Sequence, residues 1–339
     1  MPRLKRCAVY ASGAAVALSS VIAAKAAWNA LDFQLEEHAV PVLEPGARPV
    51  RLLHISDIHM APGQSAKAMW LRSLADLEPD LVINTGDNLA RHNGEGPLIE
   101  ALAPLLERPG AFVPGSHCYH TSRLKNPLSY LNKKRLTGEK IRYARKDELD
   151  WRRMHAAFED AGWVNAANAN GWIKLPAAKT SGGAGSEPHS GSGFRNAQEA
   201  ASATRWVAVS GVDDPHIGLD QPTGWPEPTM EQTIGTVAFR LGLTHAPYRR
   251  VLNQLTTAGA DLILAGHTHG GQLALPGFGA VVSNADIPAG RAAGLGVWIA
   301  GRKRTYLNVS QGIGASRFVP FRTGFKPAAS LITLVAREV

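Results

Sequence analysis

Cysteine is scarce in this chain: its 339 residues include only Cys7 and Cys118. Cys7 lies in an apolar N-terminal segment, so a structural disulfide between the two thiols is not expected, and the redox compartment stays open. The chain also has no internal repeat, and charged residues make up only 19% of it against 45% hydrophobic residues. This balance excludes a disordered protein, and the length is sufficient for one large domain or two ordinary ones.

Basic charge is concentrated in one stretch. Most of the formal net charge of +8 falls in residues 123–153, which hold eleven Lys and Arg residues against four Asp and Glu residues. This stretch is either a solvated basic helix and loop, or a surface that binds anions such as lipid headgroups or phosphorylated substrates. Each basic residue close to an anionic bilayer contributes about 1 kcal/mol. No nucleic-acid motif accompanies the stretch, so nucleic acid is not an expected partner.

The N-terminus has the pattern of a targeting or anchoring segment. Three basic residues (Arg3, Lys5 and Arg6) precede an uncharged run from Cys7 to Ala24, which at 18 residues is at the lower limit for spanning a membrane. Residues 1–30 are therefore expected to be a cleaved signal peptide or an uncleaved anchor, with a soluble helix as the alternative. The basic residues would keep the N-terminus in the cytoplasm and place the domain outside it. A secreted or a cytoplasmic protein is the alternative, and the folded unit is expected over residues 48–339.

Apolar strand-like runs alternate with helical patterns, and each run ends in a polar cluster. The helical spacing of apolar residues predicts helices over 66–77 and over 247–255. This alternation predicts an α/β fold, in which ligands bind at the carboxyl ends of the strands. Strands are expected in the segments 49–60, 79–88, 110–116, 205–215, 239–247, 260–276, 304–314 and 329–338.

One segment interrupts this alternation. Residues 175–204 are rich in Gly, Ser and Ala and have too little apolar content to pack against a core. We expect a flexible surface insertion at about 175–204, with an exposed and inert His189 inside it.

Potential metal ligands recur at successive strand ends. A single histidine in such a place is more often a structural residue, but five histidines and two aspartates in this arrangement indicate a metal site. Mixed carboxylate and imidazole ligands suit Mn, Fe, Zn or Co, whereas Mg and Ca prefer oxygen ligands. One carboxylate can bridge two cations, which then acidify a shared water and stabilise in-line displacement at phosphorus. The candidates are Asp57, His59, Asp87, Asn88, His117, His245, His267 and His269.

The motifs that carry these residues resemble those of the calcineurin-like metallophosphoesterases. They are D-x-H (Asp57, His59), G-D-N (86–88), the single His245 in "LTH", and G-H-T-H (266–269). Their order and spacing match from about residue 50 to the end of the chain. "HISDIHM" with "GHTHGGQ" is similar to the membrane-associated branch that includes YkuE-type phosphodiesterases and UDP-2,3-diacylglucosamine pyrophosphatases.

The resemblance implies a fold and a ligand set. The fold would be a four-layer αββα sandwich, in which two mixed β-sheets lie between layers of helices. Asp57, His59 and His269 would hold one divalent metal ion. His245 and His267 would hold the other, and Asp87 would bridge the two.

The third motif departs from the family pattern. The family has G-N-H-D or G-N-H-E, whereas this chain has Gly115-Ser116-His117-Cys118. In one hypothesis His117 keeps the family's proton-donor role, and Ser116, a water or Cys118 completes the second metal's shell. In a second, His117 is itself a ligand and His120 is the acid. In a third, the site is degenerate. Cys118 would ligate only as a thiolate, and a small buried side chain is the alternative.

Several further residues have two interpretations. Asp213, Asp214 and His216 end a strand, where they either line the site or stabilise a turn. Asn88 is expected to support the ligands without binding the metal, and His54 to be structural. Arg123 and Lys125 follow the third motif closely enough to reach a substrate phosphate.

The sequence therefore predicts a membrane-associated, metal-dependent phosphoesterase. A hydroxide that bridges the metals would attack phosphorus in line, and His117 would protonate the leaving oxygen. The basic stretch and the N-terminal segment favour a lipid-linked phosphodiester or pyrophosphate as substrate. The alternatives are a soluble nucleotide phosphodiesterase and a non-catalytic metal- or anion-binding protein.

Overall fold

The computed structural model describes residues 28–121, 147–176, 204–271, 274–275, 279–280, 284–315, 322 and 325–338. The candidate anchor up to residue 27, most of the basic stretch with Arg123 and Lys125, and nearly all of the expected insertion with His189 lie outside these residues. Within them, no helix has the length and apolar character needed to cross a bilayer.

The described strands form two six-stranded sheets. In the first sheet the spatial order is β1-β14-β2-β3-β4-β5, and every neighbouring pair is parallel except β14 with β2. Its strands are β1 (Gln34–Leu43), β2 (Val50–Ile55), β3 (Leu81–Asn84), β4 (Gly110–Phe112), β5 (Val164–Asn165) and β14 (Ala328–Ala336).

The second sheet has the order β12-β13-β9-β8-β7-β6. Its inner pairs are parallel, while β12 and β6 at the two edges are antiparallel to their neighbours. Its strands are β6 (Asn170–Lys174), β7 (Arg205–Gly211), β8 (Thr236–Leu243), β9 (Leu262–Ala265), β12 (Gly294–Ala300) and β13 (Lys303–Val309). A separate short hairpin pairs β10 (Ala274–Leu275) with β11 (Gly279–Ala280).

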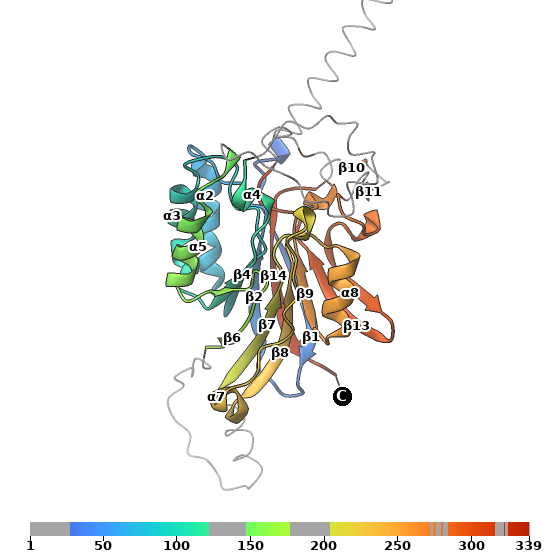
Figure 1. Cartoon of the computed structure of the whole chain (residues 1–339). Coiled ribbons are helices and arrows are strands. Elements are labelled where there is room, and N and C mark those ends of the chain that lie inside the picture. Colours follow the sequence, from blue (N-terminus) through green and yellow to red (C-terminus); the bar gives the residue numbers. More distant parts are fainter. Residues whose placement is uncertain are drawn as a thin grey trace, which may run out of the picture.

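Helices cover the outer face of each sheet, so the molecule has four layers (Figure 1). On the first sheet lie α2 (Ser65–Ser73), α3 (Glu95–Leu106) and α5 (Trp151–Asp160), and on the second lies α8 (Arg249–Thr257). One apolar core fills the space between the sheets, and two others lie beneath the helical layers. The predicted four-layer sandwich of two mixed sheets is confirmed. The remaining described helices are η1 (Leu74–Leu77), α4 (Ser116–Tyr119), η5 (Pro215–Ile217), α7 (Met230–Ile234), η6 (His269–Gly271) and η7 (Ala289–Arg291).

The first sheet begins earlier in the chain than the expected domain start at residue 48. Strand β1 pairs with β14 from Gln34 onward, so residues 34–43 belong to the sheet. Only the second half of β1 is deeply buried, and it contains Pro41. A strand that is half polar and contains a proline gives only a weak strand pattern in the sequence. Proline is also unusual inside a strand, because it has no backbone N–H to donate to the neighbouring strand.

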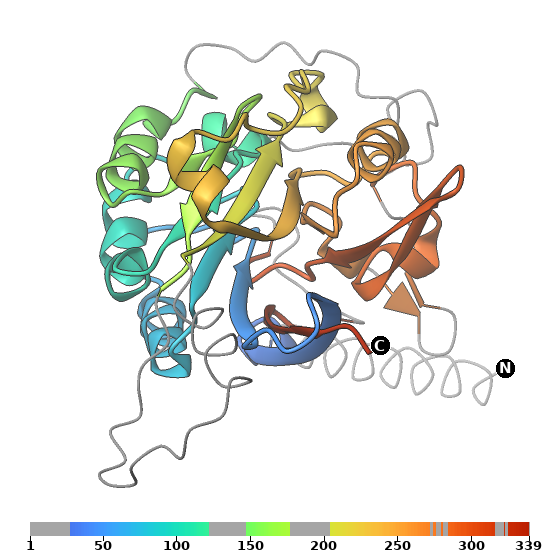
Figure 2. The ribbon, with the colours of Figure 1, turned by 90° about the horizontal axis from the view of Figure 1, so that it is seen from below.

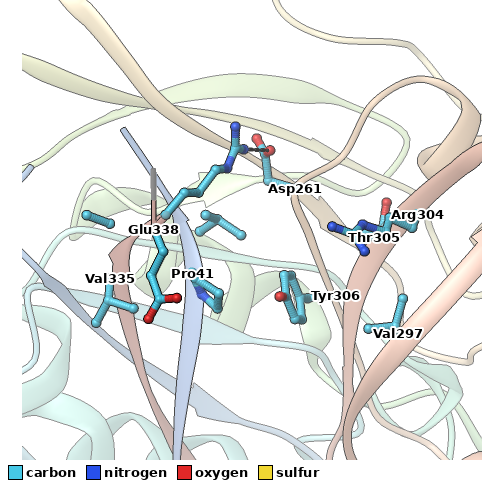
Figure 3. Close-up of a pocket in the computed structure, with 11 residues that line it drawn as sticks. Pro41, Asp261, Val297, Arg304, Thr305, Tyr306, Val335 and Glu338 are labelled. Carbon is cyan, nitrogen blue, oxygen red and sulfur yellow. Dashed lines mark hydrogen bonds and ion pairs between the residues drawn. The ribbon is translucent and has the colours of Figure 1, made fainter. Parts of the chain in front are cut away.

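A cavity of about 720 Å³ lies far along the strands from the ends that carry the predicted ligands. It is lined by residues at the amino ends of β9 and β13 and at the carboxyl end of β14, including Arg304, Tyr306 and Val335 (Figure 3). Asp261 and Arg337 form an ion pair of 2.8 Å across it. None of its lining residues is a predicted ligand.

Candidate metal centre

Loops that follow the parallel strands bring six predicted ligands together. Each sheet contributes three: Asp57, His59 and Asp87 follow β2 and β3, while the others follow β8 and β9. They form two groups, and within each group the potential ligand atoms all lie within 4.8 Å of one another. The first group is Asp57, His59 and His269, and the second is Asp87, His245 and His267.

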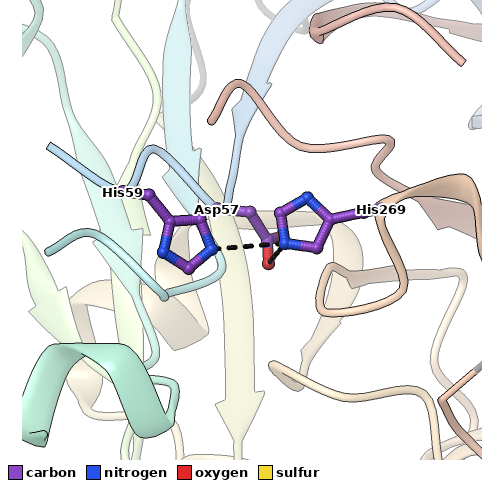
Figure 4. A group of neighbouring side chains, drawn as sticks. All are labelled: Asp57, His59 and His269. Carbon is purple, nitrogen blue, oxygen red and sulfur yellow. Dashed lines mark hydrogen bonds and ion pairs between the residues drawn. The ribbon is translucent and has the colours of Figure 1, made fainter. Parts of the chain in front are cut away.

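The first group is buried between the two sheets (Figure 4). Nε2 of His269 lies 3.2 Å from Nε2 of His59 and 3.4 Å from Oδ1 of Asp57. The hydroxyl of Ser56 donates to Oδ2 of Asp57 at 2.6 Å. Two imidazole nitrogens and a carboxylate oxygen thus face one point, as ligands of a transition metal do.

Asp87, a member of the second group, also faces the first group. Its Oδ2 is 3.9 Å from Nε2 of His59, and its Oδ1 is 3.3 Å from Nε2 of His245. Nδ1 of His245 donates to the carbonyl oxygen of Thr85 at 2.7 Å, which turns Nε2 toward Asp87. This carboxylate therefore faces a histidine of each group.

Five of the six candidate ligands have left-handed backbone conformations: φ is 50° at Asp57, 45° at His59, 52° at Asp87, 70° at His267 and 50° at His269. Such a conformation costs roughly 1–3 kcal/mol at a residue other than glycine, and it is concentrated at functional sites. Backbone hydrogen bonds between the loops hold it, including Asp57 N–H to Gly86 O (2.8 Å) and His59 N–H to Asp87 O (3.0 Å).

Two glycines allow the loops to approach the carboxylates. A Cβ atom at Gly115 would collide with the carboxylate of Asp87 and the ring of His245. A Cβ atom at Gly266 would collide with the side chains of Ser56 and Asp57. The glycines beside the motifs are thus required by close packing at both carboxylates.

Burial and charge set the protonation of the site. Burial lowers the pKa of His59 to about 3 and holds the pKa values of His267 and His269 well below the usual range, so these rings are neutral at pH 7. Burial alone would lower the pKa of His245, but the Asp87 carboxylate raises it to about 10. Burial alone would raise the pKa of Asp87, but His245 and His117 hold it well below its usual range.

The first carboxylate behaves differently from the second. Burial raises the pKa of Asp57 to about 6, although the charge of His245 acts in the opposite direction. The two carboxylates are thus distinguished by their surroundings, since Asp87 has a partner cation and Asp57 is dominated by desolvation.

His117 lies beside the two groups but belongs to neither. Its backbone N–H donates to Oδ1 of Asp87 at 2.7 Å, and its ring centroid is 5.2 Å from that of His59. Its Nδ1 is 3.1 Å from the carbonyl oxygen of His120. A carbonyl only accepts, so Nδ1 carries the proton of this hydrogen bond.

The rest of the third motif packs inward. Ser116 opens α4 and is buried. Cys118 is fully buried in the core beneath the helices, and burial raises the pKa of its thiol to about 12. The raised pKa and the burial favour Cys118 as a small side chain of the core and argue against Cys118 as a thiolate ligand. Asn88 donates to the Cys118 sulfur at 3.7 Å and accepts from Asn84 at 2.9 Å, so it braces the loop after β3.

His216 lies close to the second group, on η5 after β7. Its ring centroid is 4.3 Å from that of His267, and its Nδ1 is 3.1 Å from the hydroxyl of Tyr248. Asp214 accepts from the His216 backbone N–H at 2.8 Å, and Asp213 accepts from the hydroxyl of Tyr119 at 3.0 Å. Asp214 thus has the turn role that the sequence allowed, and His216 lines the site.

His54 lies in the interior of the first sheet. Its ring nitrogens are each 2.9 Å from a polar partner, Thr85 Oγ1 and Asn308 Nδ2. Burial lowers its pKa to about 3. This neutral ring links β2 to β13 and to the first residue after β3, and it is separate from the two ligand groups.

Three residues beside the ligands carry no signal in the sequence. Lys67 contacts the backbone of His59, Arg322 contacts the ring of His269, and Tyr248 contacts His216. Lys67 falls in a helical pattern and Arg322 follows the last glycine-rich stretch, so neither belongs to a motif. Only the folded chain places them at the site.

The fold and the two ligand groups describe a four-layer protein with a candidate metal centre at the carboxyl ends of its strands. The chain belongs to the calcineurin-like phosphoesterase family, whose sequence profile matches residues 50–271. This is a family of metal-dependent hydrolases of phosphoric esters, and the family resemblance inferred from the motifs is confirmed.

Two curated relatives share part of this domain. A "transmembrane protein with metallophosphoesterase domain" from Bos taurus is 34% identical over 128 residues, which cover 33% of this chain and 28% of the relative. The "uncharacterized metallophosphoesterase YkuE" of Bacillus subtilis (strain 168) is 30% identical over 131 residues, 38% of this chain and 40% of the relative. The matches thus span well under half of each relative's length.

Solved structures are similar at low sequence identity. TT1561 of Thermus thermophilus is 12% identical with a TM-score of 0.36, over 78% of this chain and 90% of that one. The purple acid phosphatase PPD1 from yellow lupin (Lupinus luteus) is 13% identical with a TM-score of 0.32, and the match covers 66% of this chain and 39% of PPD1.

Proposed function

We propose that this protein hydrolyses phosphoric esters with two divalent metal ions that share Asp87. The observation that carries the proposal is the position of this carboxylate, whose two oxygens face His59 in one group and His245 in the other. Two-metal phosphatases use such a shared arrangement to stabilise both the attacking and the leaving oxygen.

The residues of the site fit such a pair of ions. Asp57, His59 and His269 would hold one ion, while His245 and His267 would hold the other. Metal binding needs neutral imidazoles, and burial keeps His59, His267 and His269 neutral. Asp87 raises the pKa of His245, so an ion bound there would displace the proton from its ring. The mixed nitrogen and oxygen ligands suit Mn, Fe, Zn or Co. When bound, the ions supply a nucleophilic water at neutral pH and neutralise charge at phosphorus.

His117 is the proposed proton donor to the leaving oxygen. The carbonyl of His120 occupies Nδ1, so the protonated ring donates from Nε2. The backbone contact with Asp87 fixes the ring beside both groups. Ser116 precedes it in the position of the family's Asn, and it stays the candidate that completes the second ion's shell.

A lipid-linked phosphodiester or pyrophosphate is the proposed substrate class. The described chain starts beside the site: Asn29 Nδ2 donates to the carbonyl of Arg322 at 3.4 Å, and Arg322 Nη2 lies 3.0 Å from Nδ1 of His269. Next to Asn29, Trp28 is 74% exposed and Leu31 67% exposed. These apolar side chains suit a bilayer surface close to the metal centre.

Charge in the sequence supports the same surface. Residues 122–146 hold nine basic residues and one acidic residue. The chain leaves and re-enters the described fold beside α4, where Thr121 N–H donates to the Asp147 carbonyl at 2.8 Å. With the N-terminal segment as an anchor and Arg3, Lys5 and Arg6 on its cytoplasmic side, the domain would lie outside the cytoplasm.

Turnover assays test both parts of the proposal. We expect the purified full-length protein with Mn²⁺ to hydrolyse bis(p-nitrophenyl) phosphate, and Asp87→Asn to abolish this activity. Background turnover by the wild type, unchanged by Asp87→Asn, would show that the protein is a binder. A phosphodiester lipid in detergent micelles should be the better substrate, and a preference for soluble nucleotide diesters would overturn only the lipid assignment.

A further inference from the structure

Two buried cations lie beside the first ligand group. Lys67 is 7% exposed and Arg322 is 1% exposed. Lys67 comes from α2, whereas Arg322 comes from the C-terminal part of the chain, close to β14. Long basic side chains are rarely buried this deeply, because desolvating a cation is costly.

Lys67 holds the loop that carries His59. Its ammonium donates to the backbone carbonyls of Ile58 at 2.7 Å and His59 at 3.2 Å, and to Oε1 of Gln64 at 3.1 Å. The same Gln64 oxygen accepts the backbone N–H of Ala61 at 3.0 Å. A lysine has three donors, so one side chain satisfies all three oxygens. This clamp surrounds the left-handed backbone of His59.

Arg322, which precedes β14 in the chain, holds the ring of His269. Its Nη2 lies 3.0 Å from Nδ1 of His269 and donates to the carbonyls of Gly312, at 3.0 Å, and Gly314. Its Nη1 donates to the carbonyl of Gln311 at 2.7 Å. Since a guanidinium only donates, Nδ1 accepts, and Nε2 is the ring nitrogen that faces Asp57 and His59.

The acceptors of both cations are neutral carbonyls, an amide and an imidazole. Neither contact resembles a surface ion pair, which would add little to stability or function. Each cation instead fixes one of the two histidines of the first group. Lys67 reaches that group from α2, and Arg322 reaches it from beside the carbonyls of Gln311 and Gly312.

We propose that Lys67 and Arg322 are positioning residues of the first metal site, Lys67 through the backbone of His59 and Arg322 through the ring of His269. The inference rests on the proposed two-metal function. It assigns to this site two residues that lie outside every ligand motif.

Metal stoichiometry is the direct test, because it needs no substrate. Full-length Lys67→Met and Arg322→Met proteins are equilibrated against a series of free Mn²⁺ concentrations, and bound metal is measured by elemental analysis with Mn²⁺ EPR. We expect the affinity for one of the two ions to fall roughly 10–100-fold and the other to stay unchanged. Asp57→Asn gives the reference for loss at the first site, and Arg322→Lys should lie between wild type and Arg322→Met.

Matched controls separate positioning from general loss of charge or fold. Arg72→Met removes an exposed cation from the same helix, and Lys326→Met removes one close to Arg322; both should bind two ions as the wild type does. Two ions bound at wild-type affinity by Lys67→Met and Arg322→Met would overturn the inference. Equal weakening of both ions with a lower melting temperature in EDTA would also overturn it, because the role would then be structural. A wild type that binds no metal would instead refute the proposed function itself.

Discussion

At the scale of single residues, the centre depends on conformations that side chains rarely adopt. Asp57, His59, Asp87, His267 and His269 all have positive φ values, although none is glycine. The strain is held by backbone hydrogen bonds between neighbouring loops. Such a site is formed before any ligand arrives, so little further ordering is needed for it to act.

Gly115 should tolerate no side chain. In Gly115→Ala the new Cβ would meet Asp87 and His245, so the loop must shift. A displacement of about 1 Å at a catalytic centre can lower turnover about 100-fold, and the overpacking costs about 1–3 kcal/mol of unfolding free energy. Kinetics and urea denaturation measure the two effects. Gly96→Ala is the control, because the space around Gly96 in α3 is open; it should keep activity and gain about 0.5–1 kcal/mol.

His117→Ala should separate proton donation from metal binding. Because His117 lies outside both ligand groups, we expect two bound ions and a fall in turnover of roughly 10²–10⁴-fold. Turnover of a substrate whose leaving group needs no proton, such as p-nitrophenolate, should fall much less. Loss of one metal equivalent would instead identify His117 as a ligand.

At the scale of elements, α5 carries a buried titratable group away from the site. The ring of His155 lies about 5.0 Å from those of Phe112 and Trp151, and burial lowers its pKa to about 4. In the unfolded chain this pKa is near 6.5. Between pH 6.5 and 4 the unfolded state therefore binds more protons than the folded state. The contribution of His155 to the unfolding free energy is complete above pH 6.5 and is lost as the pH falls through that range.

His155→Phe should make the unfolding free energy depend less on pH. The aromatic replacement keeps the packing of α5 on the first sheet and removes the titration. From pH 7.5 to 4.5 in EDTA, the wild type should lose about 2 kcal/mol more unfolding free energy than the variant. Urea denaturation at the two pH values measures this, and parallel losses in both proteins would contradict it.

The elements also show what the sequence could predict. The grouping of the candidate ligands at strand ends was predictable because apolar runs followed by polar clusters mark the carboxyl ends of parallel strands. Strand β1 was missed because polar residues and Pro41 weaken its pattern. Lys67 and Arg322 were not predictable, since their acceptors are backbone carbonyls that only the tertiary fold brings within reach.

At the scale of the whole molecule, the first described residues and the metal centre are neighbours. Asn29 contacts Arg322, which contacts His269. If Trp28 and Leu31 dock on a bilayer, a full-length protein with both changed to Ser should hydrolyse a vesicle-embedded diester at least roughly 100-fold less well, since each buried side chain contributes about 1.5–3 kcal/mol. Turnover of a soluble diester should not change.

Met230 provides the matched control for that experiment. It is 81% exposed and belongs to α7, at the opposite end of the molecule from α4 (Figure 1). Met230→Ser should therefore leave turnover in vesicles and in solution unchanged. An equal loss on both substrates in the Trp28 and Leu31 variant would show that these residues support the fold and do not dock on lipid.

The composition of the two ligand groups has a further consequence for the connectivity of the chain. Seen from below, strands from both ends of the sequence meet in the middle of the molecule (Figure 2). A cut at about residue 190 would leave Asp57, His59 and Asp87 on one fragment and His245, His267 and His269 on the other. Each bound ion would then cross-link the two fragments, so metal ions should tighten the reassembly of a divided chain beyond what the pairing of β14 with β1 and β2 provides.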